Sequence, residues 1–177
     1  GTTTSSLESS NCEIQRELEL NMNYMNALES AWNELIQWKE SGRFVPENEE
    51  SIQCFLYRGM VNHLGSAVGV RSKPTHGVLG NGDMNFPDFV LGEPKQVIVE
   101  IKYARGNASI LGSCKMDIEK MKKLHFSDSV ERVFILYDEH PGCVFLNQEQ
   151  KDVLQAVDLI AAYSTIPSQS TLISQRP

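Results

Sequence analysis

The chain lacks the features of a membrane or secreted protein. None of its 177 residues fall in an apolar run near the ~20 residues that an α-helix needs to cross a bilayer. The first six residues, Gly1 to Ser6, have neither the basic start nor the apolar core of a signal peptide. We therefore expect a cytoplasmic protein with no membrane partner.

Cysteine is also scarce. The four cysteines are widely scattered and show none of the paired Cys or His spacing of a zinc site. Reduced thiols that pack in the interior are the expected state in a cytoplasmic protein. This argues against a disulfide framework and against structural zinc. The cysteines are Cys12, Cys54, Cys114 and Cys143.

Positive charge is in deficit. The chain has 16 Lys and Arg against 23 Asp and Glu, a formal net charge of −7. Proteins that bind nucleic acid usually carry a basic footprint, so this balance counts against such a partner. Acids that hold a metal contribute to the sum, however, and one basic face can coexist with an acidic remainder.

Several common functional patterns are missing. There is no dinucleotide-binding fingerprint, nucleophile elbow, helix-turn-helix or internal repeat. Gly77 to Gly82 is rich in glycine, but no Walker-type lysine follows and the segment leads into a predicted strand, so a phosphate-binding loop is rejected. A small metabolic enzyme of these classes is therefore disfavoured.

What is present is a globular composition, with 41% hydrophobic and 22% charged residues. Hydrophobic periodicity and turn residues predict an α/β domain with a mixed sheet. The expected organisation is a helical extension over 1–44, a core over 45–163 and a flexible tail over 164–177. The expected elements are disorder over 1–11, helices over 13–41, 46–64, 109–126 and 148–163, and strands over 67–72, 86–91, 97–103, 130–137 and 143–146.

The first helix has an apolar stripe at three- and four-residue spacings. Leu18, Met22, Met25, Leu28 and Trp32 lie on it. Packing on its own domain is the first interpretation. The spacing is nearly heptad, so a dimerisation helix is the alternative.

The segment from Phe86 to Tyr103 predicts a β-hairpin that brings two acids together. Gly92 to Lys95 has turn chemistry between two runs rich in β-branched and aromatic residues. If Leu91 faces Val97, counting places Asp88 opposite Glu100, with Cβ atoms about 5 Å apart.

Alternation along the second strand places Glu100 and Lys102 on one face with Ile98, and apolar residues on the other. Facing acids are destabilising in a plain sheet unless a cation lies between them. A hard divalent metal would fit two carboxylates. The alternative without a functional role is an edge hairpin with a solvated polar face.

A third acid lies in the second helix. Glu49 is three residues before Ile52 and shares its buried stripe, whereas Glu50 is rotated towards solvent. We therefore expect Glu49 to point inward. The alternative is a solvated acid that favours the helix N-terminus.

Pro87-Asp88 followed by Glu100-Ile101-Lys102 resembles the motif of the PD-(D/E)XK nuclease superfamily, which includes restriction endonucleases and Holliday-junction resolvases. The segment from Glu49 to Leu56 resembles the helix that often supplies a further acid in that superfamily. The predicted order over 46–138 also matches its core of helix, three strands, helix and strand. The resemblance implies a restriction-endonuclease-like sandwich with a mixed central β-sheet flanked by helices.

The resemblance further implies a metal-dependent endonuclease that hydrolyses DNA phosphodiester bonds, of restriction or phage-defence type. Asp88 and Glu100 would be the principal ligands of Mg²⁺, with Mn²⁺ able to substitute, and Glu49 would bind directly or through water. Lys102 would orient the attacking water and stabilise negative charge. The catalytic set is then Glu49, Asp88, Glu100 and Lys102.

The expected partner is nucleic acid, DNA in the first instance, with Arg71, Lys73 and Lys120 as candidate phosphate contacts. Lys120 belongs to a basic helix face. The alternative without a functional role is a solvated face on which Asp117 and Glu119 pair with nearby lysines. A homodimer or a partner protein could supply DNA affinity. The alternative outside the enzymes is a non-catalytic nucleic-acid-binding or assembly subunit that keeps the nuclease fold.

Overall fold

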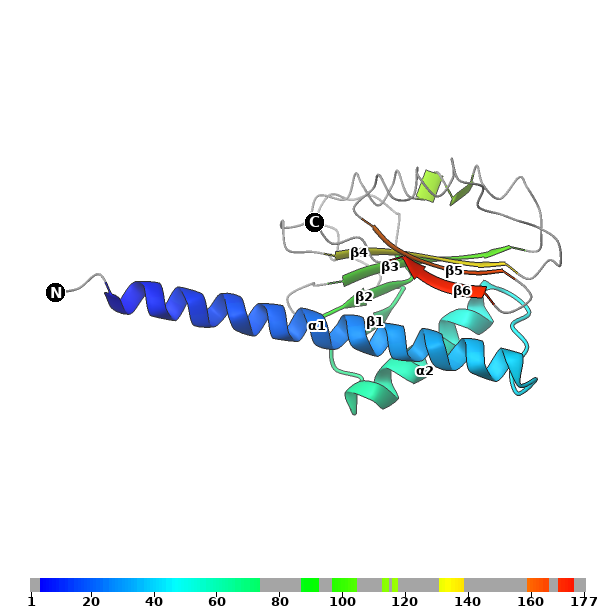
Figure 1. Ribbon diagram of the computed structural model, residues 1–177, viewed down its shortest axis with the longest axis horizontal. Helices are drawn as coiled ribbons and strands as arrows, with labels where there is room; N and C mark the ends of the chain where they lie inside the picture. The colour runs from blue at the N-terminus through cyan, green and yellow to red at the C-terminus, as the bar shows by residue number, and fades with distance from the viewer. Residues whose placement is uncertain are drawn as a thin grey trace.

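The computed structural model describes residues 4–73, 87–92, 97–104, 113–114, 116–117, 131–138, 159–165 and 169–173. Two long helices precede a six-stranded sheet (Figure 1). The helices are α1 (Thr4–Glu40) and α2 (Glu49–Leu64). The strands are β1 (Val70–Ser72), β2 (Phe89–Leu91), β3 (Val97–Ala104), β4 (Glu131–Asp138), β5 (Leu159–Thr165) and β6 (Gln169–Ile173).

Helix α1 is longer than predicted at its start. It begins at Thr4, so the expectation of disorder over 1–11 is wrong for residues 4–11, and the expected helix start at residue 13 is also wrong. Extending a formed helix adds one hydrogen bond per residue, so a polar, Ser-rich segment can continue a helix that its own composition would not nucleate. The predicted end is confirmed, because Gly42 has φ +70° and its N–H donates to the Lys39 carbonyl.

Helix α2 begins at Glu49 through a capping box, three residues after the predicted start at Pro46. The Asn48 side chain accepts a 2.8 Å hydrogen bond from the Ser51 N–H, and the Ser51 hydroxyl accepts from the Asn48 N–H. Reciprocal bonds of this kind satisfy donors that a helix start leaves free. Gly65, with φ +70°, ends the helix where expected.

The two helices pack closely against each other and against one face of the sheet. A Cβ placed on Gly59 would lie 2.7 Å from the Ala31 Cβ, so only glycine allows this approach. Trp32 and the α2 residues Ile52 and Leu56 belong to the same buried cluster. The expected packing of the first helix on its own domain is confirmed.

The sheet has strand order β1-β2-β3-β4-β5-β6. The β1–β2, β2–β3 and β5–β6 pairs are antiparallel, and the β3–β4 and β4–β5 pairs are parallel. The predicted hairpin and the predicted parallel strand after it are therefore confirmed. The chain is an α/β protein with a mixed sheet.

The C-terminal part differs from the prediction. Residues 159–163 were expected to close a helix, but Leu159–Thr165 is strand β5, and Gln169–Ile173 is strand β6 within the predicted loose tail. The boundary placed between residues 163 and 164 therefore falls inside a strand. Pairing explains the difference, because β5 lies parallel to β4 with Ile160 opposite Val133, and such neighbours override local propensity.

The two faces of β3 have different surroundings. Val97, Val99 and Ile101 belong to the cluster beneath α1 and α2. The helical fragments 113–114 and 116–117 lie on the opposite side of the sheet (Figure 1). They fall within the predicted helix over 109–126, whose remainder lies outside the described residues, as does the predicted strand over 143–146. No described helix is both long enough and apolar enough to span a membrane.

Candidate functional site

The hairpin register brings Asp88 and Glu100 to opposite positions. Leu91 pairs with Val97, and Phe89 pairs with Val99. One further step in the same register places Asp88 opposite Glu100. The register predicted from the sequence is confirmed, so the two carboxylates project from neighbouring strands at the same level.

Asp88 is held by hydrogen bonds from three elements. Its backbone carbonyl accepts from the Lys73 N–H at 2.9 Å and from Gln53 Nε2 at 3.1 Å. Its side-chain Oδ2 accepts from the Ile101 N–H at 2.7 Å. The residue is only 4% exposed. Both the backbone and the carboxylate of Asp88 are therefore fixed before any ligand binds.

Burial makes both acids resist ionisation. It is the largest cause that raises the pKa of Asp88 to about 6, with the charge of Glu49 adding to it, although the Ile101 N–H, Lys73 and Lys102 act in the opposite direction. For Glu100, burial and then the charge of Asp88 raise the pKa to about 8. Without a cation, the carboxyl group of Glu100 is therefore mostly protonated at neutral pH.

A divalent cation would lower the cost of ionising Asp88 and Glu100, because it favours the ionised form of both acids. The donor chemistry of the site fits a hard metal ion, since both side chains offer carboxylate oxygens. Within the described ranges, no group of three His, Cys, Asp or Glu side chains could hold a metal ion. The described residues thus provide a pair of facing acids rather than a full set of metal ligands.

Glu49 and Glu50 differ in position as the helical stripe predicts. Glu49 is half-buried and Glu50 is exposed. The charge of Glu49 acts on Asp88, Glu100 and Lys102. Glu49 therefore lies on the side of α2 that faces the acids and contributes negative charge there.

Lys102 pairs with an acid from the other side of the sheet. Its Nζ lies 2.8 Å from Asp117 Oδ2, with side chains 19% and 11% exposed. Burial lowers the pKa of Lys102, but the hydrogen bond and charge of Asp117, with the charges of Glu49 and Glu100, outweigh burial and raise it. The ammonium is therefore charged and fixed next to the acids.

Asp117 was missed as a site residue. Asp117 was considered only in the alternative of a solvated helix face, yet it is 8% exposed. Cys114, three residues earlier, is buried as predicted, and this spacing puts the two side chains on one helix face. The same prediction is wrong for Cys12 and Cys54, which are exposed. Burial raises the pKa of the Cys114 thiol to about 11, so it stays protonated at neutral pH.

The candidate phosphate contacts have different environments. Arg71 is half-buried, and its Nη2 donates to the Gly92 carbonyl at 3.1 Å, which ties β1 to the end of β2. Lys73 is exposed and its charge acts on Asp88. Lys120 lies outside the described residues. Of the two described residues, Lys73 is the one whose charge acts on Asp88.

Comparisons with known proteins add no relative to this description. No protein-family model, curated protein or solved structure matches the chain.

Proposed function

We propose that this protein is a metal-dependent endonuclease with a restriction-endonuclease-like fold, acting on DNA phosphodiester bonds. The observation that carries the proposal is the hairpin itself, on which Asp88 and Glu100 face each other with raised pKa values. A scaffold gains nothing from holding two acids in this way. A nuclease needs them for its metal ion.

The metal ligands would be the carboxylates of Asp88 and Glu100, with Mg²⁺ as the ion and Mn²⁺ as a substitute. Mg²⁺ usually keeps several waters and takes one or two carboxylates together with substrate phosphates, so a pair of acids suffices. When bound, the metal supplies a water that ionises near neutral pH and charge stabilisation at the phosphate. Glu49 would act through water, from the start of α2.

Lys102 would contact the attacking water and the phosphate oxygens. It shares its strand face with Glu100, and its ammonium is charged and held by Asp117. A fixed cation aimed at developing negative charge lowers the barrier because it needs no rearrangement during the reaction. Asp117 would therefore act through Lys102, as a positioning residue.

Two observations favour a second candidate, a non-catalytic DNA-binding or assembly subunit. The N-terminal part of α1 extends beyond the sheet (Figure 1), and the net charge is −7. A projecting helix suits a second copy or a partner protein, which could supply the DNA affinity that an acidic chain lacks. Such a partner is compatible with either function.

A plasmid assay separates the two candidates. Purified protein is incubated with supercoiled DNA in EDTA, Mg²⁺ or Mn²⁺, and Glu100→Ala is compared with Glu40→Ala, an exposed acid at the end of α1. Nicking that needs a divalent ion and is lost only in Glu100→Ala supports the nuclease. DNA binding without cutting by the wild type would support the assembly subunit.

A further inference from the structure

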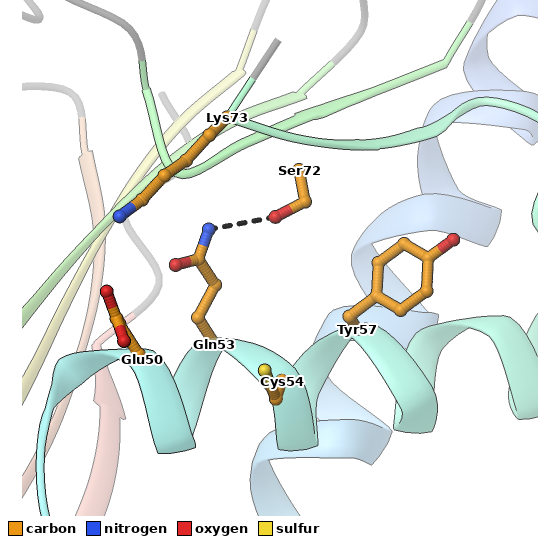
Figure 2. A pocket seen from close by; sticks show the side chains of 6 residues that line it. All are labelled: Glu50, Gln53, Cys54, Tyr57, Ser72 and Lys73. Carbon is orange, nitrogen blue, oxygen red and sulfur yellow. Dashed lines mark hydrogen bonds between the residues drawn. The ribbon is translucent and has the colours of Figure 1, made fainter.

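A hollow lies between α2 and the end of β1 (Figure 2). Its volume is about 400 Å³, a size that small-molecule sites commonly have. Two of its lining residues, Gln53 and Lys73, hydrogen-bond to the Asp88 carbonyl. The hollow therefore adjoins the backbone of Asp88, one of the two proposed metal ligands. Its lining residues are Glu50, Gln53, Cys54, Tyr57, Ser72 and Lys73.

Gln53 presents a fixed hydrogen-bond acceptor to this hollow. Its Nε2 donates to the Ser72 hydroxyl at 2.9 Å and to the Asp88 carbonyl at 3.1 Å. A carbonyl only accepts, so the amide nitrogen must face Asp88 and the amide orientation is settled. Gln53 is 6% exposed, and in Figure 2 its amide oxygen points away from the Ser72 hydroxyl. A ligand with an N–H group would satisfy it.

Lys73 supplies a cation from the opposite wall. Its φ of +42° lies in the left-handed region, which a residue with a side chain rarely adopts. The backbone is held there by the bond from the Lys73 N–H to the Asp88 carbonyl. In Figure 2 the Lys73 ammonium and the Gln53 oxygen point to the same side of the hollow. Strained backbone of this kind is often kept where a side chain must be aimed.

Tyr57 supplies an aromatic ring to the lining of the hollow. Tyr57 is half-buried and follows Gln53 by one helical turn along α2. A ring of this kind is a stacking platform for any nucleobase, because every base has a π-face. Glu50 adds a second acceptor at the N-terminal side of the hollow (Figure 2). A stacking face, acceptors for N–H groups and a cation for phosphate together match one nucleotide.

We propose that this hollow binds an unpaired nucleobase of the strand that is cut, with its phosphate at Lys73. The proposal rests on the nuclease function and gives its substrate class: DNA with an unpaired nucleotide at the cleavage position, as in a flap, a frayed end or a single strand. A paired base is stacked and hydrogen-bonded inside the duplex, so it must leave the helix to enter a side pocket.

The test uses two DNA duplexes of one sequence that differ at one unpaired position, which carries adenine in one probe and an abasic sugar in the other. Affinity is measured by fluorescence anisotropy in Ca²⁺. The wild type is expected to bind the adenine probe about tenfold more tightly. Tyr57→Ala should lose this preference, while Tyr57→Phe, which keeps the ring, and Asn62→Ala, an exposed control on α2, should retain it.

Equal affinity of the wild type for the two probes, or a preference that persists in Tyr57→Ala, would overturn the nucleobase site. Binding to neither probe would overturn it as well. Parallel cleavage of single-stranded DNA in Mg²⁺ reports on the nuclease function by itself. If Asp88→Ala abolishes the cutting and the wild type binds both probes equally, the nucleobase site is excluded and the nuclease function is retained.

Discussion

Asp88 Oδ2 accepts a 2.7 Å hydrogen bond from the N–H of Ile101, the residue that follows Glu100 in β3. This bond joins the end of one hairpin strand to the other at the level where the acids meet. It also lowers the pKa of Asp88, but burial outweighs it. The site therefore fixes a carboxylate in place while leaving it costly to ionise, and the first two predictions depend on that cost.

The metal-free protein should lose stability as pH rises. The pKa values of Asp88 and Glu100 are raised in the folded state to about 6 and about 8, above their ordinary values. The folded state therefore binds more protons than the unfolded state between pH about 4 and about 8. The stabilising contribution is full below this window and is lost as pH rises through it.

Glu100→Gln should remove most of this pH dependence, because a neutral amide has no proton to lose. At pH about 8 the variant should be more stable than wild type by about 1 to 3 kcal/mol. Thermal unfolding in EDTA across this pH range measures the effect, with Glu40→Gln as the exposed control. A wild-type pH profile in Glu100→Gln would show that Glu100 is not the titrating group.

Mg²⁺ binding should release protons near neutral pH. Glu100 is mostly protonated there, with a pKa of about 8, and must ionise to coordinate a metal. Titration calorimetry in buffers of different ionisation enthalpy measures the release. Glu100→Gln should weaken binding and abolish the buffer dependence. Heats that are the same in every buffer would contradict the assignment of Glu100 as a ligand.

Asp117→Asn should slow cleavage without weakening metal binding, because Asp117 contacts Lys102. The amide cannot balance the ammonium charge, so a loss of about tenfold or more in the cleavage rate is expected. Asp117→Glu should recover part of it, and Met116→Ala, an exposed neighbour, should be neutral. A wild-type rate in Asp117→Asn would rule out the positioning role.

Gly59→Ala should destabilise the fold by about 1 to 3 kcal/mol, because the new Cβ overpacks the helix contact. It would lie 2.7 Å from the Ala31 Cβ. Combining it with Ala31→Gly should restore part of the stability, since the same space is vacated. Urea unfolding measures both. A more stable Gly59→Ala, as helix propensity alone predicts, would contradict the close approach of α1 and α2.

The hairpin could be predicted from the sequence because its signals are local. Period-two alternation and turn residues fix the register that sets Asp88 opposite Glu100. Helical spacing likewise distinguishes Glu49 from Glu50, because a stripe that contains Ile52 must face the core.

Features set by distant partners could not be predicted in this way. Leu159–Thr165 is a strand because it pairs with β4, and its local pattern is compatible with a helix. The ion pair between Asp117 and Lys102 depends on which side of a helix meets β3. The signal in the sequence that could have located Asp117 was its position three residues after Cys114, a residue expected to pack in the interior.

The most direct test of the central claim is the single-turnover cleavage of plasmid and single-stranded DNA in Mg²⁺. Wild type is compared with Asp88→Ala, which removes a proposed ligand, and with Lys102→Ala, which removes the cation. We predict metal-dependent cutting by wild type and a loss of about a hundredfold or more in each variant. Cutting at the wild-type rate in both variants, or no cutting of any DNA by wild type, would contradict the account.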